Sequence, residues 1–223
     1  MTSTGDTKQP QRFTAQDVRA RALARLSLKL PETALDPAHR PDRGDHILNP
    51  DLYRAGLSAI AKPAAVLVPI VARGSSATIL LTKRASALRR HAGQVAFPGG
   101  RIDPEDESPL AAALREAEEE IGLDRTVVTP IGYLDVYLTH SGYRILPLVA
   151  LVTPPFALVR NPDEVEEAFE VPMEFLMEPA NHVQETRERE GISRVFYAMP
   201  YGERKIWGVT AGILHNLYER LYS

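Results

Sequence analysis

Three glutamates on one face of a short predicted helix are the residues of this 223-residue chain best placed to do chemistry. At about 100° per residue, Glu116, Glu119 and Glu120 span an arc of roughly 100°, with apolar residues on the opposite side. Like charges at such spacings repel each other by a few tenths of a kcal/mol. Carboxylate oxygens are the ligands that Mg²⁺ or Mn²⁺ prefers. The pattern therefore indicates a divalent cation site, the alternative being a solvated acidic face.

The sequence also marks the two ends of this helix. Ser108 suits the N-cap, Pro109 the first helical position, and Gly122 the position that ends the helix. Arg115 is the only nearby base on the helix, and we expect it to orient the carboxylates by hydrogen bonds; the alternative is a surface ion pair. Glu118 points away from the three acids and is expected to lie on the plain surface.

The loop before the helix completes a pattern that resembles a known family. Gly99 and Gly100 allow close approach of the backbone to a ligand, and a polar loop runs from there to Glu107. Residues 107–123 resemble the Nudix hydrolase box: glycine, five residues, glutamate, seven residues, then Arg-Glu-(aliphatic)-x-Glu-Glu-x-Gly-(aliphatic). Six residues instead of five separate Gly100 from Glu107. The register predicts an ion pair between Glu107 and Arg115.

Other segments resemble the coenzyme A pyrophosphatase branch of that family. They are Leu80–Arg84 with Arg89, Gly93 and residues 97–100, then 137–143, 163–165 with 169–172, and 206–211. The resemblance implies an α+β fold, the Nudix α/β/α sandwich with a mixed β-sheet, and the acidic helix packed across the sheet. It also implies hydrolysis of the diphosphate bond of coenzyme A or its thioesters, giving 3′,5′-ADP and (acyl-)4′-phosphopantetheine, with Mg²⁺ or Mn²⁺ as cofactor.

The chemistry assigns a role to each acid. Cations that bridge phosphate oxygens neutralise their charge and activate a water for attack. Glu116 and Glu120 present oxygens to the same point one turn apart, and Glu119 beside them could hold a second ion. The general base is either Glu120 or Glu164, which lies in the acidic segment 163–167. The alternative for that segment is a helix start with favourable acids in its first turn.

Basic residues near the glycines are candidates for substrate binding. Lys83 and Arg84 end a predicted strand, and Arg89, Arg90 and His91 follow. Coenzyme A carries a diphosphate and a separate 3′-phosphate, so more than one cationic contact is expected. The backbone of Gly99 and Gly100 could approach phosphate. His91 and His140 are expected to be hydrogen-bonding loop residues, and Trp207 either covers a base or belongs to the core.

Two other functions stay open. One is the same chemistry on another nucleoside diphosphate derivative, such as ADP-ribose or NADH. The other is a non-catalytic Nudix domain that senses a nucleotide, against which the intact Arg115, Glu116, Glu119 and Glu120 argue.

Composition is that of an ordinary globular enzyme, with 44% hydrophobic and 25% charged residues. The net charge of −3 gives no support to a nucleic-acid or membrane partner. The absence of cysteine excludes disulfides and thiolate metal sites. No apolar segment approaches the length of a membrane span, and the N-terminus lacks a signal pattern. We expect a cytoplasmic protein and a possible homodimer.

We expect a Nudix domain at residues 51–223, preceded by an N-terminal segment at residues 1–50. That segment would contain a polar tail to residue 12, an amphipathic helix over 14–30 capped by Thr14, and a linker or surface loop over 31–50. The helix would carry an apolar stripe of Val18, Ala22, Leu23, Leu26 and Leu30. The remaining predicted elements are a hairpin of 64–71 and 78–83, strands at 127–138, 145–152 and 194–199, and helices at 172–177 and 209–221.

Overall fold

The computed structural model describes residues 12–52, 57–88, 91–189 and 191–223. Most of the predicted tail, together with Arg89 and Arg90, therefore lies outside the described residues. The helices are α1 (Ala15–Arg25), α2 (Leu57–Ile60), α3 (Pro109–Ile121), α4 (Met173–Leu176) and α5 (Val209–Leu221). The strands are β1 (Arg43–Gly44), β2 (Lys62–Arg73), β3 (Ser76–Arg84), β4 (Val95–Ala96), β5 (Gly99–Arg101), β6 (Val128–Tyr133), β7 (Tyr137–Leu138), β8 (Tyr143–Val152), β9 (Val165–Pro172), β10 (Val183–Arg189), β11 (Ile192–Tyr201) and β12 (Arg204–Trp207).

A mixed sheet forms the centre of the molecule. Its two long central strands, β2 and β8, run parallel from the Lys62–Tyr143 pair to the Val71–Val152 pair. β3 returns antiparallel to β2, which confirms the predicted hairpin. β9 extends the sheet along β3, while β6 and β7 pair with β8. The short strand β5 pairs with β2 and brings the two glycines alongside the sheet.

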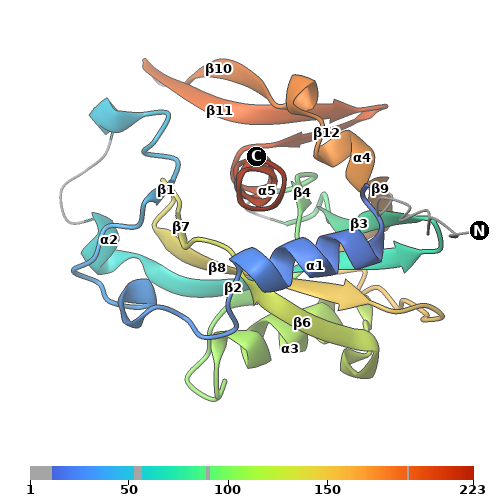
Figure 1. The fold of residues 1–223 in the computed structure, drawn as a ribbon. Helices are drawn as coiled ribbons and strands as arrows, with labels where there is room; N and C mark the ends of the chain where they lie inside the picture. The colour runs from blue at the N-terminus through green and yellow to red at the C-terminus, as the bar shows by residue number, and fades with distance from the viewer. Residues whose placement is uncertain (1–11, 53–56, 89–90, 190) are drawn as a thin grey trace, which may run out of the picture.

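Helices cover both faces of this sheet. On one face, the apolar side of α3 packs on the central strands, with Ala117 and Ile121 in one buried cluster with Leu67 and Leu148. On the other face lie α1 and α5, whose Val18 and Leu214 share a second cluster. A small antiparallel sheet of β10, β11 and β12 lies beyond α5, as Figure 1 shows. The α/β/α sandwich is therefore confirmed, with an additional three-stranded sheet.

Several predicted elements differ from the structure. α1 keeps its Thr14 cap but ends at Arg25, where the chain turns extended, and Leu23 is 59% exposed instead of belonging to the apolar stripe. The predicted strand over 127–138 is interrupted between β6 and β7. The alternative of a helix start near residue 163 is wrong, because Val165 begins β9, which pairs along the edge of β3.

The stretch expected as a linker packs on the sheet. Arg144 is a buried side chain of β8, and its guanidinium donates to the carbonyl oxygens of Ala34 at 3.3 Å and His39 at 2.7 Å. β1 in the same stretch pairs with β7. The domain boundary at residue 50 stays a prediction. No helix in the described part of the chain is long and apolar enough to cross a membrane.

Candidate functional site

The acidic helix α3 forms as its sequence predicts. The Ser108 hydroxyl accepts the Ala111 N–H at 3.1 Å, and Pro109 is the first helical residue. Gly122 adopts a left-handed conformation, with φ at 64°, that a residue with a side chain rarely takes. These caps fix both ends of α3, and its buried alanines fix its rotation, so the acids face the loop that carries β5.

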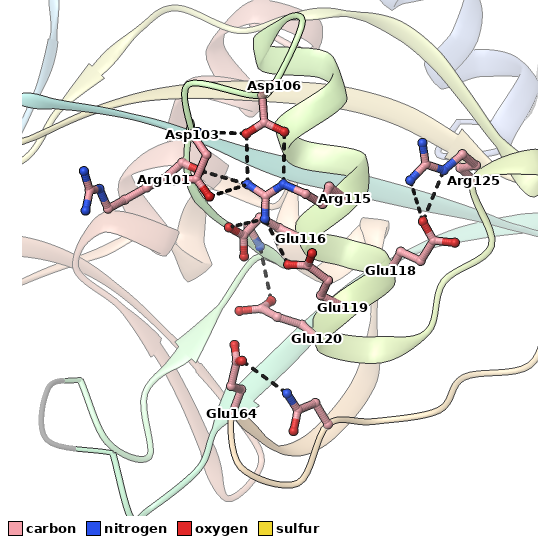
Figure 2. A network of polar contacts seen from close by, with 12 residues as sticks. Arg101, Asp103, Asp106, Arg115, Glu116, Glu118, Glu119, Glu120, Arg125 and Glu164 are labelled. Carbon is pink, nitrogen blue, oxygen red and sulfur yellow. Dashed lines mark hydrogen bonds and ion pairs between the residues drawn. The ribbon is translucent and has the colours of Figure 1, made fainter.

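Arg115 lies at the centre of the polar network that Figure 2 shows. Its Nη1 donates to Glu116 Oε1 at 3.1 Å and to Glu119 Oε2 at 2.9 Å. Its Nη2 donates to the carbonyl oxygen of Arg101 at 3.2 Å. Arg115 therefore holds two of the three predicted acids and ties α3 to the end of β5.

The loop acids that pair with Arg115 are Asp106, at 2.9 Å, and Asp103, at 3.6 Å, so the predicted Glu107–Arg115 pair is wrong. Arg115 Nε donates to Asp106 Oδ1 at 3.0 Å and Nη2 to Asp106 Oδ2 at 2.9 Å. The fork lowers the pKa of Asp106, whose side chain is only 6% exposed. A turn in which the Asp106 N–H donates to the Asp103 carbonyl directs Asp106 inward. Five residues separate Gly100 from Asp106, so the additional residue of this chain lies between the loop acid and Arg115.

Glu120 is the most buried acid of the site, at 3% exposure. Its Oε2 accepts the Gly99 N–H at 3.2 Å, and its Oε1 lies 3.9 Å from Arg84 Nη1. Burial raises the pKa of Glu120 to about 7, and the charges of Glu116 and Glu164 add to that rise. The hydrogen bond from the Gly99 N–H and the positive charge of Arg84 lower the pKa of Glu120, but by less than burial raises it. Glu120 is therefore a carboxyl group whose ionised form is under-compensated in the folded protein.

Gly100 brings the backbone of β5 against Glu116. A Cβ on Gly100 would lie 2.4 Å from Glu116 Oε1, which is closer than any ordinary contact. Burial also raises the pKa of Glu116, although Arg115 acts in the opposite direction. The absence of a side chain at Gly100 thus leaves the space that the Glu116 carboxylate occupies.

Glu164 comes to the site from the segment just before β9. Its carbonyl oxygen accepts the Ala85 N–H at 2.8 Å, and its Oε1 accepts from Asn161 Nδ2 at 3.1 Å. In Figure 2 its carboxylate points toward Glu120, and its charge contributes to the raised pKa of both Glu120 and Glu116. The structure therefore gathers Glu164 with the acids of α3.

The outer acids of α3 differ from Glu120. Glu119 is 55% exposed and bonded to Arg115. Glu118 pairs with Arg125 on the surface, as expected for a residue that points away from the site.

The donor set of this site suits a hard divalent cation, because it consists of carboxylate oxygens that repel one another. The charges of neighbouring acids contribute to the raised pKa of Glu116 and of Glu120, and a cation would relieve this repulsion. Within the described residues, no group of three such side chains is close enough to hold an ion as the side chains stand. Since Arg115 holds Glu116 and Glu119, ion binding would involve side-chain rotation toward Glu120.

An open cavity of about 990 Å³ begins beside these acids. Arg84, Gly99, Gly100 and Arg101 line it near Glu120. Lys83 is absent from the cavity lining, and its Nζ lies 2.6 Å from Glu166 Oε1. Since Lys83 pairs with Glu166 and Arg84 Nη1 lies 3.9 Å from Glu120 Oε1, only Arg84 of this pair approaches the acids of α3.

The rest of the lining includes residues that the sequence had connected with substrate binding and others that it had not. His91 lines the cavity and bonds to Gln94 at 2.9 Å, as expected of a hydrogen-bonding loop residue. Trp207 lines it too, with its ring 5.3 Å from that of Phe196. Further lining residues are Asp45, Asn49, Thr139, His140, Arg187 and Arg194. No local pattern marks Asp45 or Asn49 as cavity residues, because the contacts that place them there are with Tyr137, His140 and Val195, far along the chain.

Comparison with known proteins agrees with the motif. The family model described as the NUDIX domain matches residues 61–190. The uncharacterized Nudix hydrolase NudL of Yersinia pestis (strain Pestoides F) is 41% identical over 177 residues, which make up 79% of this chain and 87% of that relative. A MutT/nudix family protein from Enterococcus faecalis is 16% identical, with a TM-score of 0.47 over 72% of this chain and 61% of that one. An Ap4A hydrolase binary complex from C. elegans is 21% identical, with a TM-score of 0.42 over 51% of this chain and 81% of that one.

Proposed function

The chain belongs to the Nudix family, and from that premise we propose that it hydrolyses the diphosphate bond of coenzyme A or its thioesters. The products would be 3′,5′-ADP and (acyl-)4′-phosphopantetheine. Family membership supports the coarser statement, a Nudix hydrolase acting on a nucleoside diphosphate derivative. The resemblance over Leu80–Gly100 supports the finer choice of coenzyme A.

The observation that carries this proposal is the cavity beside Glu120. Its volume of about 990 Å³ lies at the upper end of the range for small-molecule sites. It begins at Arg84 and the two glycines, beside the acids, and its lining includes Arg187, Arg194, Phe196 and Trp207. Arginine side chains suit phosphate groups. A long ligand with phosphates at separate points, such as coenzyme A, matches this lining.

The acids of α3 would hold the cofactor, Mg²⁺ or Mn²⁺, through Glu116, Glu119 and Glu120. Bound there, the cation would neutralise phosphate charge and lower the pKa of a coordinated water. Arg115 would orient Glu116 and Glu119, and Asp106 would hold Arg115 in place. The positive charge of the cation would also balance the negative charge of ionised Glu120, and this would offset the free-energy cost of burying that carboxylate.

The substrate contacts follow from the cavity lining. The backbone of Gly99 and Gly100 would lie along the diphosphate, and Arg84 would donate to its oxygens. Lys83 is ion-paired with Glu166 and would contribute long-range charge only.

We assign the general base to Glu164, with Glu120 as the alternative. Glu164 faces Glu120 from a different element (Figure 2), so it need not be committed to the cation. Replacing Glu164 with Gln should lower kcat by about a hundredfold, with little change in cation affinity. A kcat close to that of the wild-type protein would move the role to Glu120.

The experiment that tests the function is a product assay by mass spectrometry with Mg²⁺ or Mn²⁺. Its substrates are coenzyme A, acetyl-coenzyme A, ADP-ribose and NADH, and the control is Glu120→Gln. Release of 3′,5′-ADP from coenzyme A, lost in the variant, is the expected result. Preferential cleavage of ADP-ribose or NADH would overturn the choice of substrate. Nucleotide binding without cleavage would favour a sensor.

A further inference from the structure

The end of the cavity away from the acids carries an unusual pair of charges. Arg187 on β10 and Arg194 on β11 are directly opposite each other in the antiparallel register, and both line the cavity. Among the residues that the structure describes, neither guanidinium has an acidic partner within ion-pair distance. Like charges directly opposite on a sheet destabilise it. Both side chains are exposed, so water and salt screen part of this repulsion, and an anion in the cavity would offset the remainder.

Aromatic side chains lie next to these arginines. Phe196 follows Arg194 by two residues on β11, so both point to the same face of the small sheet. Phe196 lines the cavity together with Trp207 of β12. This wall therefore presents two cations and an aromatic surface to whatever fills the cavity.

The wall is tied to the main sheet by Asn49. Its Nδ2 donates to the Val195 carbonyl oxygen at 2.8 Å, and its Oδ1 accepts the Val195 N–H at 2.8 Å, as a neighbouring strand would. The same amide donates to the Asp45 carbonyl oxygen at 2.8 Å. The Asp45 carboxylate in turn accepts from Tyr137 at 2.8 Å and from the His140 N–H at 2.7 Å. These bonds fix the distance between Arg194 and the main sheet.

We propose that Arg187 and Arg194 form a subsite for a second phosphate group of the substrate, separate from the diphosphate that lies at Gly99 and Gly100. The inference rests on the proposed function and adds a specificity to it. Two guanidinium forks suit a phosphate monoester, which offers three oxygens at once. Coenzyme A carries such a monoester at its 3′ position. A substrate that has the diphosphate but no further phosphate would leave the positive charges of Arg187 and Arg194 unbalanced.

The test compares kcat/KM for coenzyme A and for dephospho-coenzyme A, which lacks the 3′-phosphate. The wild-type protein should prefer coenzyme A by about tenfold or more. Arg187→Gln/Arg194→Gln should remove this preference and leave the rate on dephospho-coenzyme A within about twofold. The matched control is Arg73→Gln, an exposed arginine at the far end of β2 that does not line the cavity.

Two results would overturn the subsite. An equal fall on both substrates would mean that the arginines attract anions only through the long-range field of the protein. An unchanged preference would mean that they do not contact the phosphate. Arg187→Lys/Arg194→Lys separates charge from fork geometry, and it should recover only part of the preference.

A binding measurement keeps this inference distinct from the proposed function. By titration calorimetry without divalent cations, the wild-type protein should bind 3′,5′-ADP about tenfold more tightly than AMP, and the double Gln variant should bind both alike. If the protein cleaves only ADP-ribose yet shows this difference, the proposed function fails and the subsite stands. If wild type and variant both bind the two nucleotides alike, the subsite fails whatever the enzyme cleaves.

Discussion

Replacing Glu120 with Gln should inactivate the protein and, in the absence of divalent cations, make it more stable at alkaline pH. The reason is the burial of Glu120, which is 3% exposed and has its pKa raised from 4.5 to about 7. Gln keeps the shape of the side chain and an oxygen to accept the Gly99 N–H, and it carries no charge to desolvate. Catalysis and stability are therefore expected to move in opposite directions.

The magnitude follows from linkage. A carboxyl group whose pKa is higher in the folded state binds more protons there, so its contribution to the free energy of unfolding is full below pH 4.5 and is lost as pH rises through 7. Each pKa unit corresponds to about 1.4 kcal/mol, so the full effect is about 3 kcal/mol. About 2 kcal/mol of it should disappear between pH 5.5 and pH 8.

The assay is urea unfolding of both proteins at these two pH values, with EDTA present. Other groups that titrate in this range affect both proteins alike, so the difference between the two pH dependences isolates Glu120. The wild-type protein should lose about 2 kcal/mol more than Glu120→Gln on going to pH 8. Parallel pH dependences would refute the account of Glu120 as an under-compensated buried acid.

Adding Mg²⁺ at pH 8 extends this experiment to the cofactor without any measurement of turnover. A cation that binds the folded state at Glu120 stabilises it by mass action. The urea midpoint of the wild-type protein should rise with Mg²⁺ concentration, and that of Glu120→Gln should rise much less. Equal responses would place the cation elsewhere.

Three other substitutions test parts of the site. Gly100→Ala should lower kcat by about a hundredfold and leave the urea midpoint nearly unchanged. The new Cβ would displace the flexible Glu116 carboxylate without moving the backbone. Wild-type kinetics in this variant would mean that the site does not need glycine at this position. Asp106→Asn should cost about 1–2 kcal/mol in urea unfolding, since it weakens the fork to Arg115, whereas Glu107→Gln should stay within about 0.5 kcal/mol; the reverse order would restore Glu107 as the partner. Asn49→Ala should reduce the preference for coenzyme A over dephospho-coenzyme A in steady-state kinetics, because it removes both hydrogen bonds between the Asn49 side chain and the Val195 backbone. An unchanged preference would mean that β11 keeps its position without these two bonds.

The parts of the site that the sequence predicted correctly are those that local rules determine. α3 begins and ends where its caps lie, because Ser108 and Gly122 bond to backbone groups within five residues. Its acids share a face because of the helical period. The loop partner of Arg115 was mispredicted because a turn in the loop directs Asp106 toward Arg115. The number of residues between the loop acid and the helix does not reveal that turn.

The small sheet was predicted only in part: the expected strand at 194–199 is confirmed as β11, whereas β10 and β12 were not predicted. β10 consists largely of charged and polar residues, so it lacks the apolar alternation that marks a strand. Its stability comes from pairing with β11 and from contacts such as the Lys205–Glu185 ion pair, at 2.5 Å, that bridge from β12. Likewise, Asn49 and Val195 are separated by 146 residues. Tertiary contacts of this kind have no local signature.

This division between local and tertiary determinants follows in part the proposed division between chemistry and specificity, with Arg187 of the proposed subsite as an exception inside the part that matches the family. The acids, the glycines and Arg84 all lie within residues 61–190, the part that matches the family. Asp45 and Asn49 precede that part, while Arg194, Phe196 and Trp207 follow it. Substitutions in these flanking segments would reshape one wall of the cavity without moving the carboxylates on α3. A relative with the same acidic helix and different flanking segments is therefore expected to break the same bond in a different nucleotide.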